Sequence, residues 1–143
     1  MINTIIESIS AALQDEFGDG YEIRMEESEQ GMEKPCFFIF CQNSSNERFP
    51  GNRYFRTNPF CIQYFPVSGE KQRECNRAAE RMYQCLEHVT VKGDDKPVMG
   101  TKMRYEVVDG VLNFFVNYDM FMIRQQKNEG AMEKVTGNVT AKG

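Results

Sequence analysis

Residues 101–124 of the chain read TKMRYEVVDGVLNFFVNYDMFMIR, and this stretch decides the fold. Two alternating apolar runs meet at Asp109-Gly110, a dipeptide that favours the positive φ angles of a tight type I′ turn. The stretch therefore predicts a long β-hairpin. In its second strand the even-numbered positions from Leu112 to Met122 are apolar or aromatic, so we expect that face to pack on the core. The odd-numbered positions mix aromatic and polar side chains: Val111, Asn113, Phe115, Asn117, Asp119 and Phe121.

Composition points to a single globular domain. The chain has 143 residues, 41% of them hydrophobic, which suffices for a sizeable core. Its net charge of −4 argues against a general nucleic-acid binder. No window of about eighteen residues is apolar enough to span a membrane, and the N-terminus lacks the basic region of a signal peptide. We therefore expect a protein made in the cytoplasm, with no membrane partner.

Hydrophobic periodicity predicts two helices, at residues 3–17 and roughly 69–89. Three strands are predicted before the hairpin: residues 21–25, residues 35–42 as a strand buried on both faces, and residues 53–65. Pro59 inside the last of these favours a sheet edge or a bulge there. The intervening residues 43–52 are rich in Ser, Asn, Pro and Gly and predict a loop or an irregular edge.

This order of elements predicts an α+β fold. Two helices would pack on one face of a mixed, mainly antiparallel sheet of about four or five strands, ending in the long hairpin. The other face of the sheet would have to be covered by something else. Residues 1–124 form the predicted domain. Residues 125–143 are polar and aperiodic, which is typical of a tail that is flexible or that orders only on assembly.

The sequence offers no convincing catalytic, cofactor-binding or metal site. Phosphate-binding glycine motifs are absent. The five cysteines form no CxxC pair, and a zinc site would need clustered Cys and His ligands, whereas the chain has a single histidine, His88. Cys85 and His88 could form a nucleophile pair on one helix, but no flanking motif supports that interpretation.

Arginines and aromatic residues interleave in residues 48–56. This pattern fits a protein contact surface, a stacking patch for nucleic acid, or a plain strand with an exposed charged face. Together with the mixed face of the hairpin it supplies the candidate contacts with other subunits or with a tube: Arg48, Arg53, Tyr54, Arg56, Asn113, Phe115, Asn117, Asp119 and Phe121.

Several stretches resemble a known family. They are INTIIESISAALQDEF followed by GYEIRME, the strand FFIFC, NPFCIQYFP running into RECNRAAERMYQCLEHV, and above all MRYEVVDGVLNFFVNYDMFMIR. In order and character they resemble the small tail terminator proteins of bacteriophages and of phage-tail-like particles from Gram-positive bacteria. The resemblance covers about residues 1–125.

The resemblance implies a structural subunit without enzymatic activity or cofactor. Such subunits form a ring, typically a hexamer, that caps the head-proximal end of the tail tube, ends its polymerisation and joins tail to head. The implied partners are other copies of the chain, the tube protein, the head-completion proteins and, in contractile particles, the tail sheath protein. DNA would only pass through the lumen. The protein would assemble in the host bacterial cytoplasm and end in the neck of the particle. Two alternatives stay open at this point: a head-completion or connector protein, and a small-molecule-binding α/β domain with an apolar pocket between helices and sheet.

Overall fold

A computed structural model describes residues 1–26, 35–91 and 97–124, and the backbone of 133–135. It contains the two predicted helices, α1 (Ile2–Phe17) and α2 (Lys71–Cys85). In α1 the apolar residues Ile5, Ile9 and Leu13 recur every four positions and are fully buried. In α2 the buried stripe starts at Cys75 and continues through Ala78, Ala79 and Met82.

Three sheets make up the β structure. The five-stranded sheet has the order β1-β2-β5-β9-β8, where only β1 and β2 pair in parallel. Its strands are β1 (Glu22–Arg24), β2 (Cys36–Cys41), β5 (Pro59–Phe65), β9 (Val111–Asn117) and β8 (Thr101–Val108). The four-stranded sheet has the order β11-β10-β4-β3, with β11 (Glu133–Val135), β10 (Met120–Arg124), β4 (Arg53–Thr57) and β3 (Ser45–Phe49). A small hairpin pairs β6 (His88–Thr90) with β7 (Pro97–Met99).

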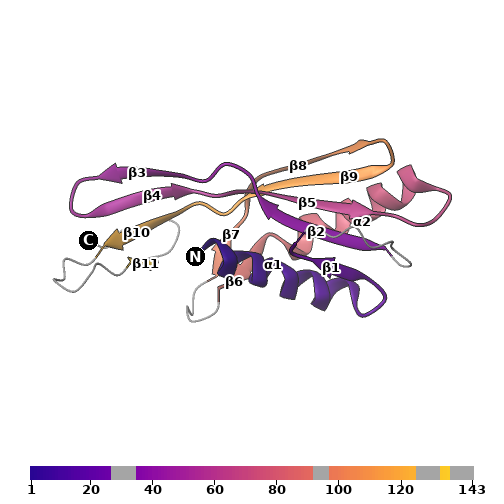
Figure 1. Ribbon diagram of the computed structural model, residues 1–143, viewed down its shortest axis with the longest axis horizontal. Helices are drawn as coiled ribbons and strands as arrows, with labels where there is room; N and C mark the ends of the chain where they lie inside the picture. The colour runs from indigo at the N-terminus through magenta and orange to yellow at the C-terminus, as the bar shows by residue number, and fades with distance from the viewer. Residues whose placement is uncertain (27–34, 92–96, 125–132, 136–143) are drawn as a thin grey trace.

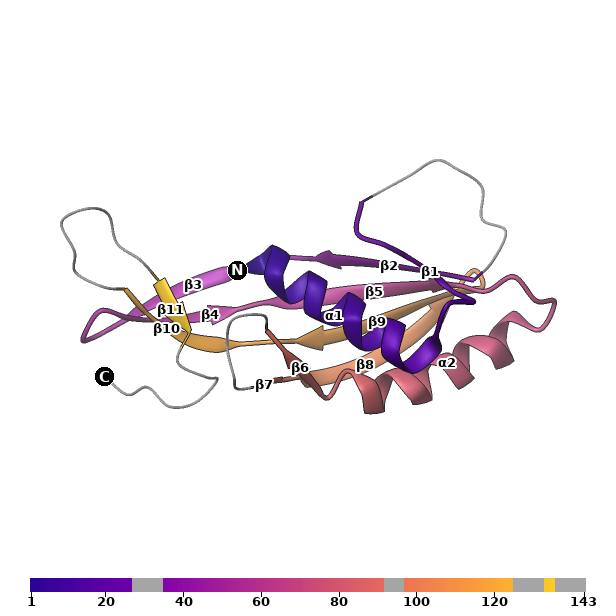
Figure 2. The ribbon, with the colours of Figure 1, turned by 90° about the horizontal axis from the view of Figure 1, so that it is seen from below.

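The two larger sheets form one long layer, and both helices lie on the same side of it (Figure 1). Seen from that side, α1 crosses the layer and α2 runs next to it (Figure 2). The hairpin of β3 and β4 extends beyond the start of α1 in both views. We call residues 45–57 the arm. The predicted α+β fold, with two helices on one face of a mixed sheet, is confirmed.

Asn58 joins the two sheets at the point where β4 continues into β5 and β9 into β10. Its side chain is completely buried. The Nδ2 atom donates to the Tyr118 carbonyl at 2.9 Å, and the backbone N–H donates to Asp119 Oδ1 at the same distance. Ser44 Oγ donates to Asn58 Oδ1 at 3.1 Å. These bonds satisfy the polar groups that the interrupted strand pairing leaves behind.

The hairpin at residues 101–124 is confirmed in its first part and corrected in its second. Asp109 and Gly110 both have positive φ, at 52° and 77°, as a type I′ turn requires. The second strand, however, ends at Asn117, and β10 then joins the other sheet. The single strand predicted at 53–65 is likewise divided into β4 and β5.

Residues 43–52, predicted as a loop or an irregular edge, contain β3, which pairs with β4 at the edge of the four-stranded sheet. Other local predictions were wrong. Pro59 is neither at an edge nor in a bulge: it is the first residue of a central strand, where a missing N–H is tolerated. The second helix ends at Cys85, four residues early, and His88 starts β6 instead of ending a helix. The predicted tail at 125–143 lies outside the described residues, apart from the backbone of β11.

Candidate assembly surface

The face of the long layer that points away from the helices carries most of the phenylalanines. We call it the open face. Strand register and alternation place seven of the eleven Phe residues on it: Phe38, Phe40, Phe49, Phe55, Phe65, Phe115 and Phe121. All seven are partly exposed. In the described part of the chain, both helices cover the opposite face (Figure 1).

The alternation that creates this face is strict in β9. Leu112, Phe114 and Val116 are fully buried against the helices. Phe115, between them, points to the open face, where the Arg104 guanidinium lies 4.1 Å from the ring centroid. Such a cation–π contact holds the ring in place while leaving it accessible.

Amide groups are ordered among the rings of the open face. Gln63 Nε2 donates to Asn113 Oδ1 at 3.0 Å across β5 and β9. Cys61 lies nearby with 2% of its surface exposed, and burial raises the pKa of its thiol to about 11. The surface therefore combines apolar area with pre-arranged polar groups, a mixture typical of protein interfaces.

The open face continues onto the arm. Phe121 lies between two rings of the arm, with centroids 4.9 Å from Phe55 and 5.5 Å from Phe49. The Arg53 guanidinium is 6.0 Å from the Phe121 centroid. The sequence placed Phe121 and the segment 48–56 in two separate candidate patches, whereas pairing of β10 with β4 brings them together.

The arm also has a second face, which points to the helix side of the layer. We call it the underside. It carries Arg48, Tyr54 and Arg56, because these alternate with the open-face residues of β3 and β4. The Arg124 guanidinium lies 4.7 Å from the Tyr54 ring centroid. The nine predicted contact residues are therefore divided between two faces.

Six of the nine share the odd-numbered side that forms the open face: Arg53, Asn113, Phe115, Asn117, Asp119 and Phe121. Within this group Asp119 has a structural role, since its carboxylate accepts a hydrogen bond from the N–H of Asn58 at the junction of the two sheets.

Sequence reasoning missed Phe38, Phe40 and Phe65. The alternation in β2 could have identified the first two, but the strand was interpreted as buried on both faces. Phe37 and Ile39 are buried, whereas Phe38 and Phe40 are only partly so.

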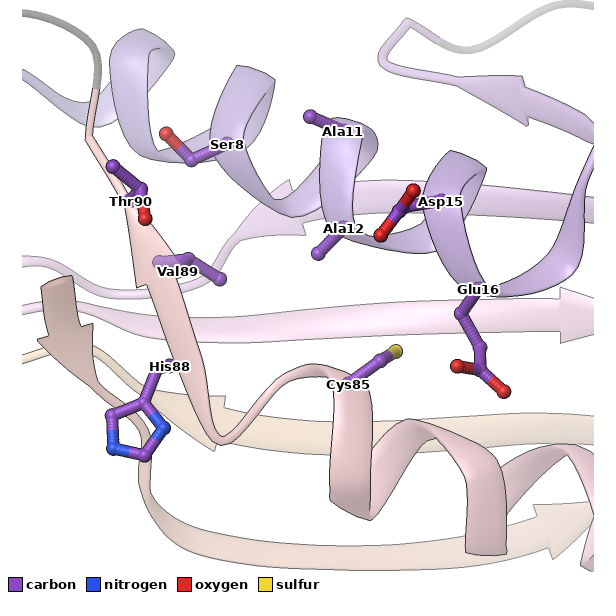
Figure 3. A pocket seen from close by; sticks show the side chains of 9 residues that line it. All are labelled: Ser8, Ala11, Ala12, Asp15, Glu16, Cys85, His88, Val89 and Thr90. Atoms are coloured by element: carbon purple, nitrogen blue, oxygen red, sulfur yellow. The ribbon is translucent and has the colours of Figure 1, made fainter.

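A groove of about 600 Å³ lies on the helix side, between α1 and β6 (Figure 3). Small residues of α1 and the acids Asp15 and Glu16 line one wall, and Cys85, His88 and β6 line the other. Burial raises the pKa of the Cys85 thiol to about 12, so the thiol stays protonated at neutral pH and is a poor nucleophile. Ser8 Oγ donates to the Thr4 carbonyl of its own helix at 2.9 Å. Five of the nine residues that line the groove are polar or charged, so it is not the mainly apolar pocket expected of a small-molecule site.

Within the residues that the structure describes, no three His, Cys, Asp or Glu side chains group as metal ligands. No helix in the same part of the chain is both long and apolar enough to cross a membrane.

The family model described as phage tail terminator protein matches residues 4–130, which is most of the chain. The chain belongs to the phage tail terminator family. Among curated proteins, none matches its sequence.

Membership of the phage tail terminator family indicates the general role of the chain. Phage tail terminators are structural proteins of the phage and not an enzyme family, so this chain has a structural role in tail completion. It belongs to the tail of the virion and associates with other tail components. The open face and the arm are the surfaces of the described residues that such association could use.

Proposed function

We propose that this tail terminator forms a ring, with six copies as the expected number, on the head-proximal end of the tail tube. The ring ends tube polymerisation and presents a surface to the head. The observation that supports the proposal is the open face. Seven partly exposed phenylalanines lie on this one face, spread over two sheets, and gathered apolar side chains of this kind mark surfaces that bind other proteins.

A closed ring with cyclic symmetry needs two different, complementary surfaces on each subunit. The open face supplies apolar area, and Asn113, Phe115, Asn117 and Phe121 are its proposed contact residues in the hairpin strands. The underside of the arm supplies a surface of different character, because it carries Arg48 and Arg56 beside Tyr54. The chain therefore has the unlike surfaces that a heterologous interface requires.

The proposed partners are further copies of the chain, the tube protein and, beyond the ring, sheath and head-completion proteins. Assembly would take place in the host bacterial cytoplasm. DNA passes through the lumen of the ring without sequence-specific contacts. A head-completion or connector role differs only in its partner, and no particular residue favours it.

The proposal is tested by adding the purified protein to polymerising tube protein. We expect light scattering at micromolar concentrations to give a ring-sized mass, and negative-stain images to show rings. Tubes formed in its presence should be shorter and should carry density at one end only. Purified heads without tails serve as the comparison, because a head-completion protein would bind the heads and leave tube length unchanged. A strictly monomeric protein that ignores tubes would refute the ring.

A further inference from the structure

We propose that neighbouring copies join edge to edge, with β8 of one copy pairing as an additional strand with β1 of the next. Their five-stranded sheets then form one continuous sheet around the ring. The inference rests on the proposed ring and deepens it, because it names a backbone contact between subunits in addition to the open face and the arm.

The five-stranded sheet ends in a different strand on each side. Among the strands that the structure describes, β1 pairs with β2 alone and β8 with β9 alone, so the two lie at opposite edges (Figure 2). Only the pair of β1 and β2 is parallel, so β8 runs antiparallel to β1. An edge strand presents a row of backbone groups with which another strand can pair. Because the two edges face opposite directions, a contact between them repeats from copy to copy, as a ring requires.

The turn of the hairpin determines which backbone groups of β8 point outward. In a two-residue hairpin the residues that flank the turn, here Val108 and Val111, form a hydrogen-bonded pair. Bonded and non-bonded pairs alternate along an antiparallel ladder, so Glu106 also bonds to β9. The N–H and C=O groups of Tyr105 and Val107 therefore point away from the sheet, toward the next copy.

In β1 the outward groups belong to Ile23. The Glu22 N–H donates to the Pro35 carbonyl at 2.8 Å, so the backbone groups of Glu22 face β2. Alternation then turns the N–H and C=O of Ile23 to the outer edge. In an antiparallel pair the outward groups of both strands must meet, so Ile23 stands opposite an odd-numbered residue of β8.

Charge selects one register among those that remain. With Ile23 opposite Val107, two pairs of opposite charge come face to face: Arg24 with Glu106, and Glu26 with Arg104. A shift by two residues in one direction places Arg24 opposite Arg104, and a shift in the other direction places Glu26 opposite Glu106. Like charges directly opposite each other destabilise a strand pair. Both halves of this charge pattern lie on one chain, which favours a second copy over an unrelated strand.

The faces of the two edges agree with this register. Arg104 lies on the open face over Phe115, and Arg24 lies on the same face beside Phe38. The contact therefore keeps the open faces of both copies on one side, as equivalent subunits of a ring require. The regular part of β8 after its register shift, residues 104–108, matches residues 22–26 in length. Since residues 25–26 form a bend after β1, pairing extends β1 by two residues.

The backbone contact is tested with Val107→Pro in the full-length protein. Proline has no N–H, and an edge strand tolerates it where the N–H points outward. We expect circular dichroism to show a folded chain. Sedimentation velocity should show an apparent dissociation constant of self-association raised by roughly tenfold or more. The matched variant Val107→Thr keeps the β-branched shape and the N–H, and it should associate within a few-fold of the wild type.

The register is tested with a charge swap at two exposed positions, Arg104→Glu and Glu26→Arg. Each single variant opposes like charges and should weaken association at low salt by roughly tenfold or more. In a mixture that alternates around the ring, the introduced acid meets the introduced base, and the other interfaces keep the native pair. The mixture and the double variant should therefore recover association to within a few-fold of the wild type. The control is Arg73→Glu, an equal change of charge at a side chain of α2 that is 76% exposed, and it should leave association unchanged.

The outcomes separate the two proposals. If a folded Val107→Pro assembles like the wild type, or if mixing the charge variants restores nothing, the edge pairing is wrong and the ring can stand. The charge swap decides alone if the proline variant loses its far-ultraviolet signal. If swapping restores association but the wild type forms open chains, the edge pairing holds and the closed ring is wrong. A wild type that stays monomeric, alone and with tubes, overturns both. A proline variant that self-associates normally but no longer shortens tubes would assign the edge to the tube protein and refute the pairing between copies.

Discussion

Gly100 is a residue whose identity is set by packing. It is buried between β7 and β8. A Cβ atom there would lie 2.8 Å from the Leu86 carbonyl oxygen and 2.9 Å from Val116 Cγ2. The backbone oxygen cannot move away easily, because it accepts the Tyr118 hydroxyl at 2.6 Å. We expect Gly100→Ala to lower the free energy of unfolding by about 1–3 kcal/mol.

Urea denaturation of the monomer measures this effect. Gly20→Ala is the matched control, since nothing lies within 4 Å of the Cβ that it would add. It should change stability by less than about 0.5 kcal/mol. If Gly100→Ala and Gly20→Ala unfolded at the same urea concentration, the packing of α2, β8 and β9 around Gly100 would be looser than described.

Glu74 should make stability depend on pH. Burial by itself would raise the pKa of this carboxyl, but hydrogen bonds with Ser68 and Tyr64 and the nearby Arg77 charge outweigh burial and hold the pKa below its ordinary value of 4.5. A lowered native pKa means that the charged form stabilises the fold above pH 4.5. This contribution is lost as the pH falls through the native pKa.

The prediction is tested with Glu74→Gln, which removes the titrating group. We expect the variant to be less stable than the wild type at neutral pH and to lose less stability between neutral and acidic pH. Chemical denaturation at a series of pH values provides the measurement. Glu80→Gln, at an exposed position on the same helix, should retain the pH dependence of the wild type. Parallel pH curves for the wild type and Glu74→Gln would contradict the assignment.

At the scale of elements, we expect two neighbouring residues of β9 to serve folding and assembly separately. Phe114 is fully buried, whereas Phe115 lies on the open face. Phe114→Asp would bury a charge without a partner, and we expect a loss of more than about 4 kcal/mol, enough to unfold the chain. Phe115→Asp should leave the fold intact and prevent ring formation.

Circular dichroism and size-exclusion chromatography distinguish the two cases. Phe114→Asp should lose its far-ultraviolet signal, and Phe115→Asp should keep that signal but elute as a monomer. Phe115→Leu keeps an apolar side chain at the same position and should still assemble. If Phe114→Asp and Phe115→Asp behave alike, the two faces of β9 have been assigned wrongly.

Elements with strong local patterns could be predicted from the sequence. The periodicity of α1, the alternation of β9 and the Asp109-Gly110 turn each depend on nearby residues, and each is present. The strand β3 could not be predicted, because Ser45-Asn46-Glu47-Arg48 has low β propensity and no apolar alternation. Its conformation comes from pairing with β4, a tertiary effect.

The candidate surface could be predicted only in part, because it too depends on how strands pair in the folded chain. The odd-numbered residues of β9 could be placed on one face from alternation alone. The proximity of Phe121, in β10, to Phe55 depends on the break at Asn58 and Tyr118, where both strands pass into a second sheet. The hydrogen bonds of a buried Asn with residues about sixty positions away leave no signal in a single sequence.

At the scale of the whole molecule, the subunit has two unlike sides. The open face is aromatic, and the helix side carries the acidic α1 and the groove. Among the strands that the structure describes, the central β5 and β9 each pair on both sides, whereas β3 pairs with β4 alone. Backbone amides in the arm should therefore be far less protected than those of the central strands when the chain is monomeric.

Hydrogen exchange followed by mass spectrometry tests how assembly changes this pattern. In the variant Phe115→Asp, expected to be monomeric, β3 should exchange within the shortest labelling times and β5 and β9 should exchange most slowly. In the assembled wild type, exchange should slow in β3, because the arm is one of the two surfaces proposed to join neighbouring subunits. The exposed side of α2 around Arg73 lies outside both surfaces and should exchange alike in the two samples. Slower exchange confined to α2, with β3 unchanged, would place the interface between subunits elsewhere on the molecule.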